Sequence, residues 1–314
     1  MCPAPAASGK SVCVMDASGP LGHALVDRLL RRGYTVHAAT YTHHADQDDQ
    51  DSESLLRQLS SSCSGDKQQR LKVFQADPFD YHTIAGAVRG CSGLFCMFST
   101  PHDQATCDEA MAEMEVRAAH NVLEACAQTE TMERVVFTSS VTAVVWKENH
   151  KLVDAFDEKN WSELSFCRKF KLWHALAKTL SEKTAWALAM DRGVDMVAIN
   201  AGLLTGPGLT AAHPYLKGAP DMYEDGVLVT VDVDFLADAH VAVYESPTAY
   251  GRYLCFNNAV CGPEDAVKLA QMLSPSAPRS PPSDELKVIP QRIQDKKLNK
   301  LMVEFASGIY GELD

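Results

Sequence analysis

The sequence has no run of 18 apolar residues, so it is not expected to form a membrane-spanning helix. It is also poor in positive charge: 29 Lys and Arg stand against 41 Asp and Glu, a formal net charge of −12. This balance argues against nucleic acid or an anionic membrane as a partner, and no pattern points to a protein partner. The N-terminal segment MCPAPAASGK is too short and too polar for a secretory signal, which favours a cytoplasmic protein.

The ten cysteines include no C-x-x-C pair and no Cys/His group at zinc spacing, so no metal site is expected. Cys13, Cys96 and Cys255 lie inside apolar runs, and we interpret them as buried, reduced thiols. Disulfides or a metal site are the less favoured alternative. Internal repeats are absent, and 314 residues, 46% of them hydrophobic, predict one large α/β domain with an appended lobe or two modest domains.

The segment 11–41 has the pattern of a β-α-β unit. Its first five residues form an uncharged apolar run, as expected for a buried parallel strand. After the loop 16–22, leucines recur at helical spacing up to Gly33, which is expected to end the helix. A β-rich run then begins at Tyr34.

The loop of this unit is the candidate dinucleotide site. Gly19 would let the backbone approach a pyrophosphate, Gly22 would let the helix pack on the strand, and the helix N-terminus would face the anion. Such loops usually open with glycine, whereas this one opens with Asp16. A loop whose glycines serve only helix packing is the alternative. The loop residues that we assign to the cofactor are Asp16, Ser18, Gly19, Pro20 and Leu21.

Strand and helix patterns continue to alternate along the chain, with further strands expected near Leu71, Gly93, Arg134 and Val194. This alternation predicts a doubly wound parallel sheet of the Rossmann type. A Gly- and Pro-rich segment after residue 200 marks a change of character. We expect a dinucleotide-binding domain at 1–200 to which 227–260 returns, and a smaller substrate lobe at 201–226 and 261–314.

Three polar residues are expected at the carboxyl edge of this sheet. Ser140 ends the fifth strand, and His174 and Lys178 are one turn apart on one face of a helix expected over 169–192. A hydroxyl donor, a titratable ring and an ammonium at a nicotinamide suit carbonyl reduction. Alternatively, Ser140 bonds local backbone, His174 is a core histidine and Lys178 is solvated. A serine hydrolase lacks support because no G-x-S-x-G motif surrounds Ser140.

The motifs VCVMDASGPLG, RRGYTV, RVVFTSS, AKTLSEKTAW, LLTGPGL and GRYLC occur in an order that resembles the plant cinnamoyl-CoA reductase and dihydroflavonol reductase family, which are extended short-chain dehydrogenase/reductases. The resemblance implies NADP(H) as cofactor and reduction of a hydrophobic, phenylpropanoid- or flavonoid-like carbonyl compound, a small molecule. The family's catalytic serine falls on Ser140 and its lysine on Lys178. The catalytic tyrosine falls on His174.

Other departures from the family fall at positions that bind the cofactor or the CoA group. Tyr41 replaces the arginine that holds the 2′-phosphate of NADP, although no acid at the end of the second strand selects NAD(H), which stays the alternative cofactor. Tyr41, Asp77 and Lys178 complete the residues assigned to the cofactor. Pro214 and Gly262 replace the basic residues that contact CoA, so reduction of a CoA ester has the least support.

Two hypotheses remain. The first is an NADP(H)-dependent reductase in which Ser140, His174 and Lys178 do the chemistry, and the retention of the serine and the lysine favours it. The second is a non-catalytic or weakly catalytic, cofactor-binding or regulatory relative, which the loss of the tyrosine and the presence of Asp16 and Tyr41 favour. Lys178 is expected to lower the pKa of His174, so a reductase that uses His174 as acid should lose activity above about pH 6–7.

Overall fold

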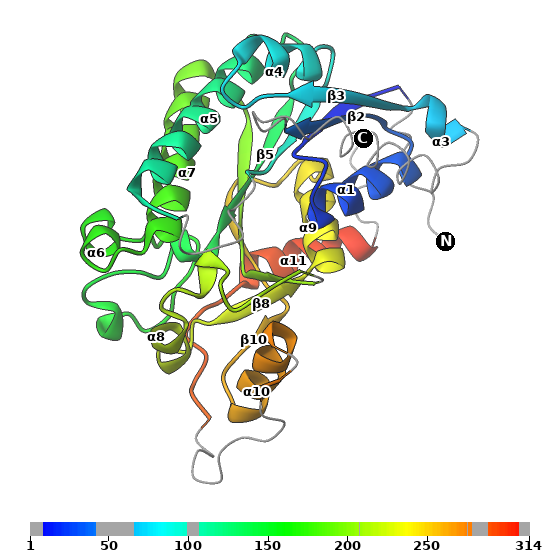
Figure 1. The fold of residues 1–314 in the computed structure, drawn as a ribbon. Helices are drawn as coiled ribbons and strands as arrows, with labels where there is room; N and C mark the ends of the chain where they lie inside the picture. The colour runs from blue at the N-terminus through cyan, green and yellow to red at the C-terminus, as the bar shows by residue number, and fades with distance from the viewer. Residues whose placement is uncertain are drawn as a thin grey trace.

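A seven-stranded parallel sheet forms the centre of the fold, with helices on both faces (Figure 1). The computed structural model describes residues 9–41, 66–98, 107–206, 208–274, 276–277 and 288–307. The strands follow the order β3-β2-β1-β4-β5-β6-β9, and every pair of neighbours is parallel. Their bounds are β1 Ser11–Met15, β2 Thr35–Tyr41, β3 Leu71–Ala76, β4 Gly93–Cys96, β5 Arg134–Ser140, β6 Met196–Ala201 and β9 Gly251–Cys255. The expected doubly wound parallel sheet is confirmed.

The first strand explains why both faces of the sheet are covered. Val12 and Val14 pack into one apolar cluster with helices α1 (Pro20–Arg31), α9 (Val233–Glu245) and α11 (Lys296–Ser307). Cys13 and Met15 point the other way, into a cluster with α4 (Tyr81–Val88), α5 (Glu109–Ala127) and α7 (Trp173–Arg192). Since successive side chains of a strand alternate between the faces, an uncharged strand needs helices on both sides.

Strand order reverses between β1 and β4, which are neighbours in the sheet. From β1 the chain moves outward through β2 to β3, and after α4 it returns to β4 and continues in the other direction. In doubly wound sheets, ligands bind at the carboxyl ends of the strands beside such a reversal. The loops after β1 and β5 both leave the sheet at this edge.

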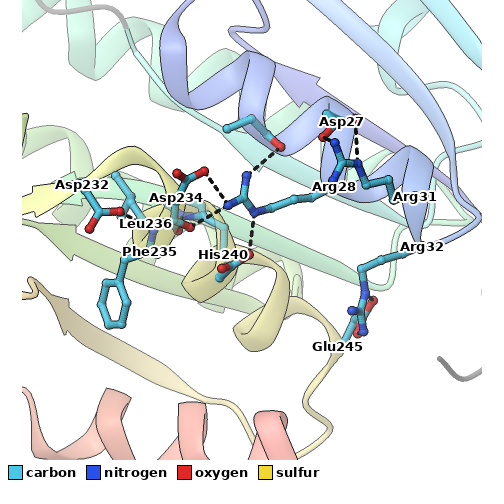
Figure 2. A network of polar contacts seen from close by, with 12 residues as sticks. Asp27, Arg28, Arg31, Arg32, Asp232, Asp234, Phe235, Leu236, His240 and Glu245 are labelled. Carbon is cyan, nitrogen blue, oxygen red and sulfur yellow. Dashed lines mark hydrogen bonds and ion pairs between the residues drawn. The ribbon is translucent and has the colours of Figure 1, made fainter. Parts of the chain in front are cut away.

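Charged side chains join α1 to α9 (Figure 2). Arg28 of α1 contacts the carboxylates of Asp234 and Asp238 on α9, and Arg32 pairs with Glu245 at the far end of α9. Phe235 points away from these charges, and its amide donates to the Asp232 carboxylate that caps α9 (2.7 Å). The two helices are thereby fixed to each other beside the sheet.

A second sheet has three strands, in the order β10-β8-β7. Its core includes residues of α7 and of the segments near 145, 215 and 228. The elements of this region and the remaining short helices are β7 (Leu203–Thr205), β8 (Val229–Asp232), β10 (Asn258–Ala259), α3 (Asp66–Gln69), η2 (Val141–Ala143), η3 (His150–Leu152), α6 (Leu164–Lys169), η4 (Pro214–Leu216), α8 (Ala219–Glu224) and α10 (Pro263–Leu273). Helix α11, which we expected in the smaller lobe, packs on α9 and β9 instead, with Leu298 and Leu301 in the cluster that contains α1.

The helix expected over 169–192 is interrupted. Helix α6 ends at Lys169 and α7 begins at Trp173, because Lys171 adopts a left-handed conformation (φ 52°) that a helix interior does not allow. Gly193 ends α7 at φ 70° and Gly33 follows α1 at φ 96°, as the sequence predicted. The short helix expected around 54–59 lies outside the described residues. The break places His174 in the first turn of α7.

The eight cysteines in the described ranges are free thiols, and all except Cys261 are buried. Burial raises the pKa of the Cys13 and Cys96 thiols well above the ordinary value, so they are inert apolar side chains rather than reactive groups. No helix in the described part of the chain is long and apolar enough to cross a membrane.

Candidate active site

Asp16 directs its carboxylate into its own loop. Its Oδ1 accepts the Ser18 amide at 2.8 Å and also contacts the Ser18 hydroxyl. Asp16 is only 7% exposed. The carboxylate in the loop that would face a pyrophosphate is thus held by the adjacent backbone amide.

The N-terminus of α1 suits an anion. Its cap, Gly19, provides no side-chain hydrogen bond, Pro20 follows, and the first turn contains no acidic residue. A Cβ built at Gly19 would meet no atom within 4 Å, so the space beside it is open. A Cβ at Gly22 would lie 2.3 Å from the Asp16 carbonyl oxygen, so this glycine is needed for helix–strand packing. Among the described residues, the loop therefore has the open backbone that a dinucleotide phosphate requires.

The other cofactor assignments lie at the same edge. The backbone of Tyr41 pairs with that of Ala76 at the ends of β2 and β3, and Asp77 follows directly. The Asp77 carboxylate accepts the Phe79 amide at 2.8 Å, and the Asp77 amide donates to Thr83 Oγ1 at 2.9 Å. These bonds fix the turn that leads into α4. Tyr41 and Asp77 thus lie at the carboxyl edge of the sheet, as predicted. Their contact with a cofactor remains a prediction.

Ser140 and His174 lie on either side of Thr142, and all three side chains are buried. Thr142 Oγ1 donates to Ser140 Oγ at 3.0 Å and lies 3.1 Å from His174 Nδ1. The Thr142 amide also donates to Ser140 Oγ, at 3.2 Å. The serine and the histidine therefore lie close together, as expected, but the Thr142 hydroxyl lies between them. Ser140 also bonds local backbone, as the alternative interpretation expected, because its side chain caps η2.

Burial keeps His174 neutral. It lowers the pKa of the imidazole well below 6.5, and the charge of Lys178 and His213 lowers this pKa further. The rings of His213 and Tyr215 lie 6.3 and 6.0 Å from the His174 ring, measured between centroids. The expected direction of the pKa shift holds, although burial is a larger cause than Lys178.

Lys178 forms an ion pair with Glu115, a residue of α5 that the sequence did not single out. Only 8% of the lysine side chain and 10% of the glutamate side chain are exposed. The solvated alternative for Lys178 is therefore wrong. The ammonium is placed one turn beyond His174 and is held there by a carboxylate from the neighbouring helix.

A second buried ion pair supports the end of β5. Glu182 of α7 accepts Arg252 Nε at 2.6 Å and the Ser139 hydroxyl at 2.6 Å, and it also accepts the Asn200 amide at 2.7 Å. The Arg252 guanidinium lies 3.7 Å from the centre of the Trp161 ring. This group of residues ties β5, β6, β9 and α7 together directly beside Ser140.

Sequence patterns alone had not indicated Thr142, Glu115 or Glu182. Thr142 follows Ser140 at a spacing of two, which would have been a weak signal. Glu115 and Glu182 have no local signal, since their partners are 63 and 70 residues away. Within the described ranges, no group of three His, Cys, Asp or Glu side chains is arranged to bind a metal ion.

Comparison with known proteins identifies the family of the chain. Residues 12–223 match the family model described as "NAD dependent epimerase/dehydratase family". The chain is 34% identical to cinnamoyl-CoA reductase 1 of Petunia hybrida over 309 residues, which cover 95% of this chain and 88% of that one. It is 35% identical to cinnamoyl-CoA reductase 2 of Arabidopsis thaliana over 307 residues, with the same coverage.

The fold is also similar to that of a solved structure. Vestitone reductase from alfalfa superposes with a TM-score of 0.68 at 27% identity, over 93% of this chain and 91% of that one. A bifunctional dihydroflavonol 4-reductase/flavanone 4-reductase of Malus domestica is 32% identical over 317 residues, which cover 94% of this chain and 86% of that one. The chain therefore belongs to the NAD-dependent epimerase/dehydratase family and, within it, to the NAD(P)-dependent oxidoreductases of the cinnamoyl-CoA and dihydroflavonol reductase type.

Proposed function

We propose that the protein is an NADP(H)-dependent reductase of an aromatic, phenylpropanoid- or flavonoid-like carbonyl compound. The observation that carries the proposal is the contiguous arrangement of Ser140, Thr142 and His174, with Lys178 one turn further along α7, at the carboxyl edge of the sheet. The assignment of NADP(H) and of the substrate class draws on the family, whose members include cinnamoyl-CoA and dihydroflavonol reductases.

The residues that would hold the dinucleotide are the open turn at Gly19, the first turn of α1 and the groups at the ends of β2 and β3, together with Lys178. When bound, the nicotinamide supplies the hydride that carbonyl reduction needs. The chain must supply the proton and hold the carbonyl oxygen.

Ser140 is the group with a hydrogen to give. Its Oγ accepts two hydrogen bonds, both from Thr142, and no described residue accepts one from it. Its own hydrogen is therefore available to a carbonyl oxygen. His174 is neutral and does not deliver a proton as imidazolium at pH 7. A reductase that used imidazolium as its acid would therefore lose activity at a lower pH than the pH 6–7 that the sequence suggests.

The surroundings favour an uncharged aromatic substrate. His213 and Tyr215 place two rings beside His174. Pro214, which begins η4, and Gly262, which caps α10, stand where the family's CoA-contacting residues are basic. Reduction of a free carbonyl compound is accordingly favoured over reduction of a CoA ester.

The second candidate is a cofactor-binding, regulatory relative without turnover. Two observations favour it: His174 is a neutral, buried ring in the place of the tyrosine, and Glu115 already neutralises Lys178.

One experiment separates the two candidates. NADPH and NADH are titrated against the protein by nicotinamide fluorescence, and cinnamaldehydes, flavanones and dihydroflavonols are then tested as substrates of the wild type, His174→Phe and His174→Tyr. The reductase proposal predicts turnover that falls in His174→Phe and rises in His174→Tyr. Binding of NADPH with no turnover in any of the three supports the regulatory relative, and no binding of either dinucleotide refutes both.

A further inference from the structure

Thr142 occupies the space between the two groups that the proposed function assigns to the reacting centre. It is 2% exposed, and its hydroxyl contacts Ser140 on one side and His174 on the other. Nothing in the chemistry assigned so far uses this hydroxyl. A buried hydroxyl in contact with two functional groups must share its single hydrogen between them, so the direction of each bond has consequences.

The hydrogen bonds between His174, Thr142 and Ser140 are all donated in one direction, from the histidine toward the serine. Thr142 Oγ1 donates to Ser140 Oγ, so its hydrogen is used. The contact of 3.1 Å with His174 must then be a bond that Nδ1–H donates and Thr142 Oγ1 accepts. In a neutral ring this leaves Nε2 without a hydrogen. The ring therefore cannot donate from Nε2, the atom farthest from the backbone, as the family's tyrosine would donate from its hydroxyl.

Thr142 is held rigidly. Its carbonyl accepts the Ser162 hydroxyl at 2.8 Å, and Ser162 Oγ in turn accepts the Trp146 amide at 2.9 Å. The Thr142 amide is fixed on Ser140 through the cap of η2. The Thr142 hydroxyl therefore lies within hydrogen-bond distance of Ser140 Oγ and His174 Nδ1 without rearrangement, as proton transfer requires.

We propose that Thr142 is a positioning residue that links His174 to Ser140 in a hydrogen-bond relay, through which Ser140 recovers the proton that it gives to the substrate carbonyl. The inference rests on the proposed reductase function. It assigns to His174 the role of supplying the relay from Nδ1 and not of protonating the substrate directly.

The protons balance along the relay. Hydride addition at the carbonyl carbon leaves an alkoxide, to which Ser140 Oγ gives its proton. Thr142 Oγ1 passes its hydrogen to Ser140, His174 Nδ1 passes one to Thr142, and Nε2 takes up one proton from solvent water. His174 remains neutral and ends in the opposite tautomer, and exchange with water restores Nδ1–H before the next turnover.

Two variants test the relay. Thr142→Val removes the hydroxyl and keeps the branched shape, whereas Thr142→Ser keeps the hydroxyl. The first readout is the ¹⁵N spectrum of the His174 imidazole in the protein without substrate. The proposal predicts the Nδ1–H tautomer in wild type and Thr142→Ser, and a shift toward Nε2–H in Thr142→Val.

The second readout is turnover with NADPH. In Thr142→Val we expect kcat to fall about 100-fold with little change in KM, as for the loss of a general acid–base contribution, while Thr142→Ser stays close to wild type. The wild-type kcat should also show a solvent deuterium isotope effect that Thr142→Val alters. Thr142→Ala serves as a second hydroxyl-free variant if the valine variant does not fold, and thermal melts identify such a failure.

The two readouts distinguish a failure of the relay from a failure of the proposed reductase function. An Nε2–H tautomer in the wild type, or wild-type kcat in Thr142→Val, overturns the relay while the reductase function stands. A wild type that binds NADPH without turning over any carbonyl compound overturns the proposed function and, with it, proton delivery by the relay.

Discussion

Glu115 on α5 and Lys178 on α7 form an ion pair that is almost fully buried between two helices of the same face of the sheet. Removing one partner of such a pair leaves an uncompensated charge, which costs about 3–5 kcal/mol, whereas removing both costs much less. We expect Glu115→Leu and Lys178→Met each to lower the free energy of unfolding by this amount. The double variant should lose less than the sum, as urea denaturation would measure. Losses that add to within about 0.5 kcal/mol would show that the two residues do not interact.

Asp16 is expected to weaken dinucleotide binding, because its carboxylate lies in the loop that would face the pyrophosphate. Like charges a few ångströms apart repel by about 1–4 kcal/mol with partial screening, so Asp16→Gly should bind NADPH about tenfold more tightly. Asp16→Asn is the matched control, since it removes the charge and can still accept from Ser18. An equal gain in NADPH affinity in the two variants would show that the charge of Asp16 is the cause. A gain in the glycine variant alone would show that the shape of the side chain is the cause. Calorimetric titration at two salt concentrations distinguishes these cases.

The two glycines of the loop should respond differently to a methyl group. In Gly22→Ala the Cβ would lie 2.3 Å from a backbone oxygen, so we expect a loss of about 2 kcal/mol or more in stability. In Gly19→Ala the space is open, and the loss should stay below about 1 kcal/mol, while NADPH affinity falls because the methyl group enters the space proposed for the phosphate. Thermal melts and fluorescence titration measure the two effects. Equal stability of the two variants would contradict the packing role of Gly22.

Protonation of buried histidines should destabilise the fold at low pH. His240 donates from Nδ1 to the Leu236 carbonyl and faces Thr138 through Nε2, both at 2.7 Å, and burial lowers its pKa to about 4. The unfolded pKa is about 6.5, so this contribution is fully present above pH 6.5 and is lost as pH falls toward 4. The loss from His240 alone amounts to about 3 kcal/mol, and His174 adds to it in the same direction.

Urea unfolding of wild type and His240→Gln between pH 7.5 and 4.5 measures this contribution, because carboxylates that titrate in the same range act on both proteins. The variant should lose less stability than the wild type over that interval. Parallel curves for the two proteins would show that His240 takes up its proton equally in the folded and unfolded states.

The sequence alone determined the β-α-β unit, the parallel sheet and the one-turn spacing of His174 and Lys178. These features depend on local periodicity: an uncharged run becomes a strand covered on both faces, and residues four apart share one face of a helix. The sequence also placed Ser140 at the end of its strand, since β5 ends at this residue. The break before α7 was missed, because the left-handed conformation of Lys171 has no glycine to mark it.

Only the tertiary structure decided which groups meet. Glu115 reaches Lys178 because α5 packs along α7, and Glu182 reaches Arg252 because β9 adds to the sheet beside β6. The role of Thr142 follows from the same cause: η2 turns its hydroxyl between Ser140 and the first turn of α7. The pairs Glu115–Lys178, Glu182–Arg252 and Thr142–His174 link residues far apart in the chain, and no local pattern encodes them. The tautomer and charge of His174, on which the chemistry depends, are set by these contacts and by burial.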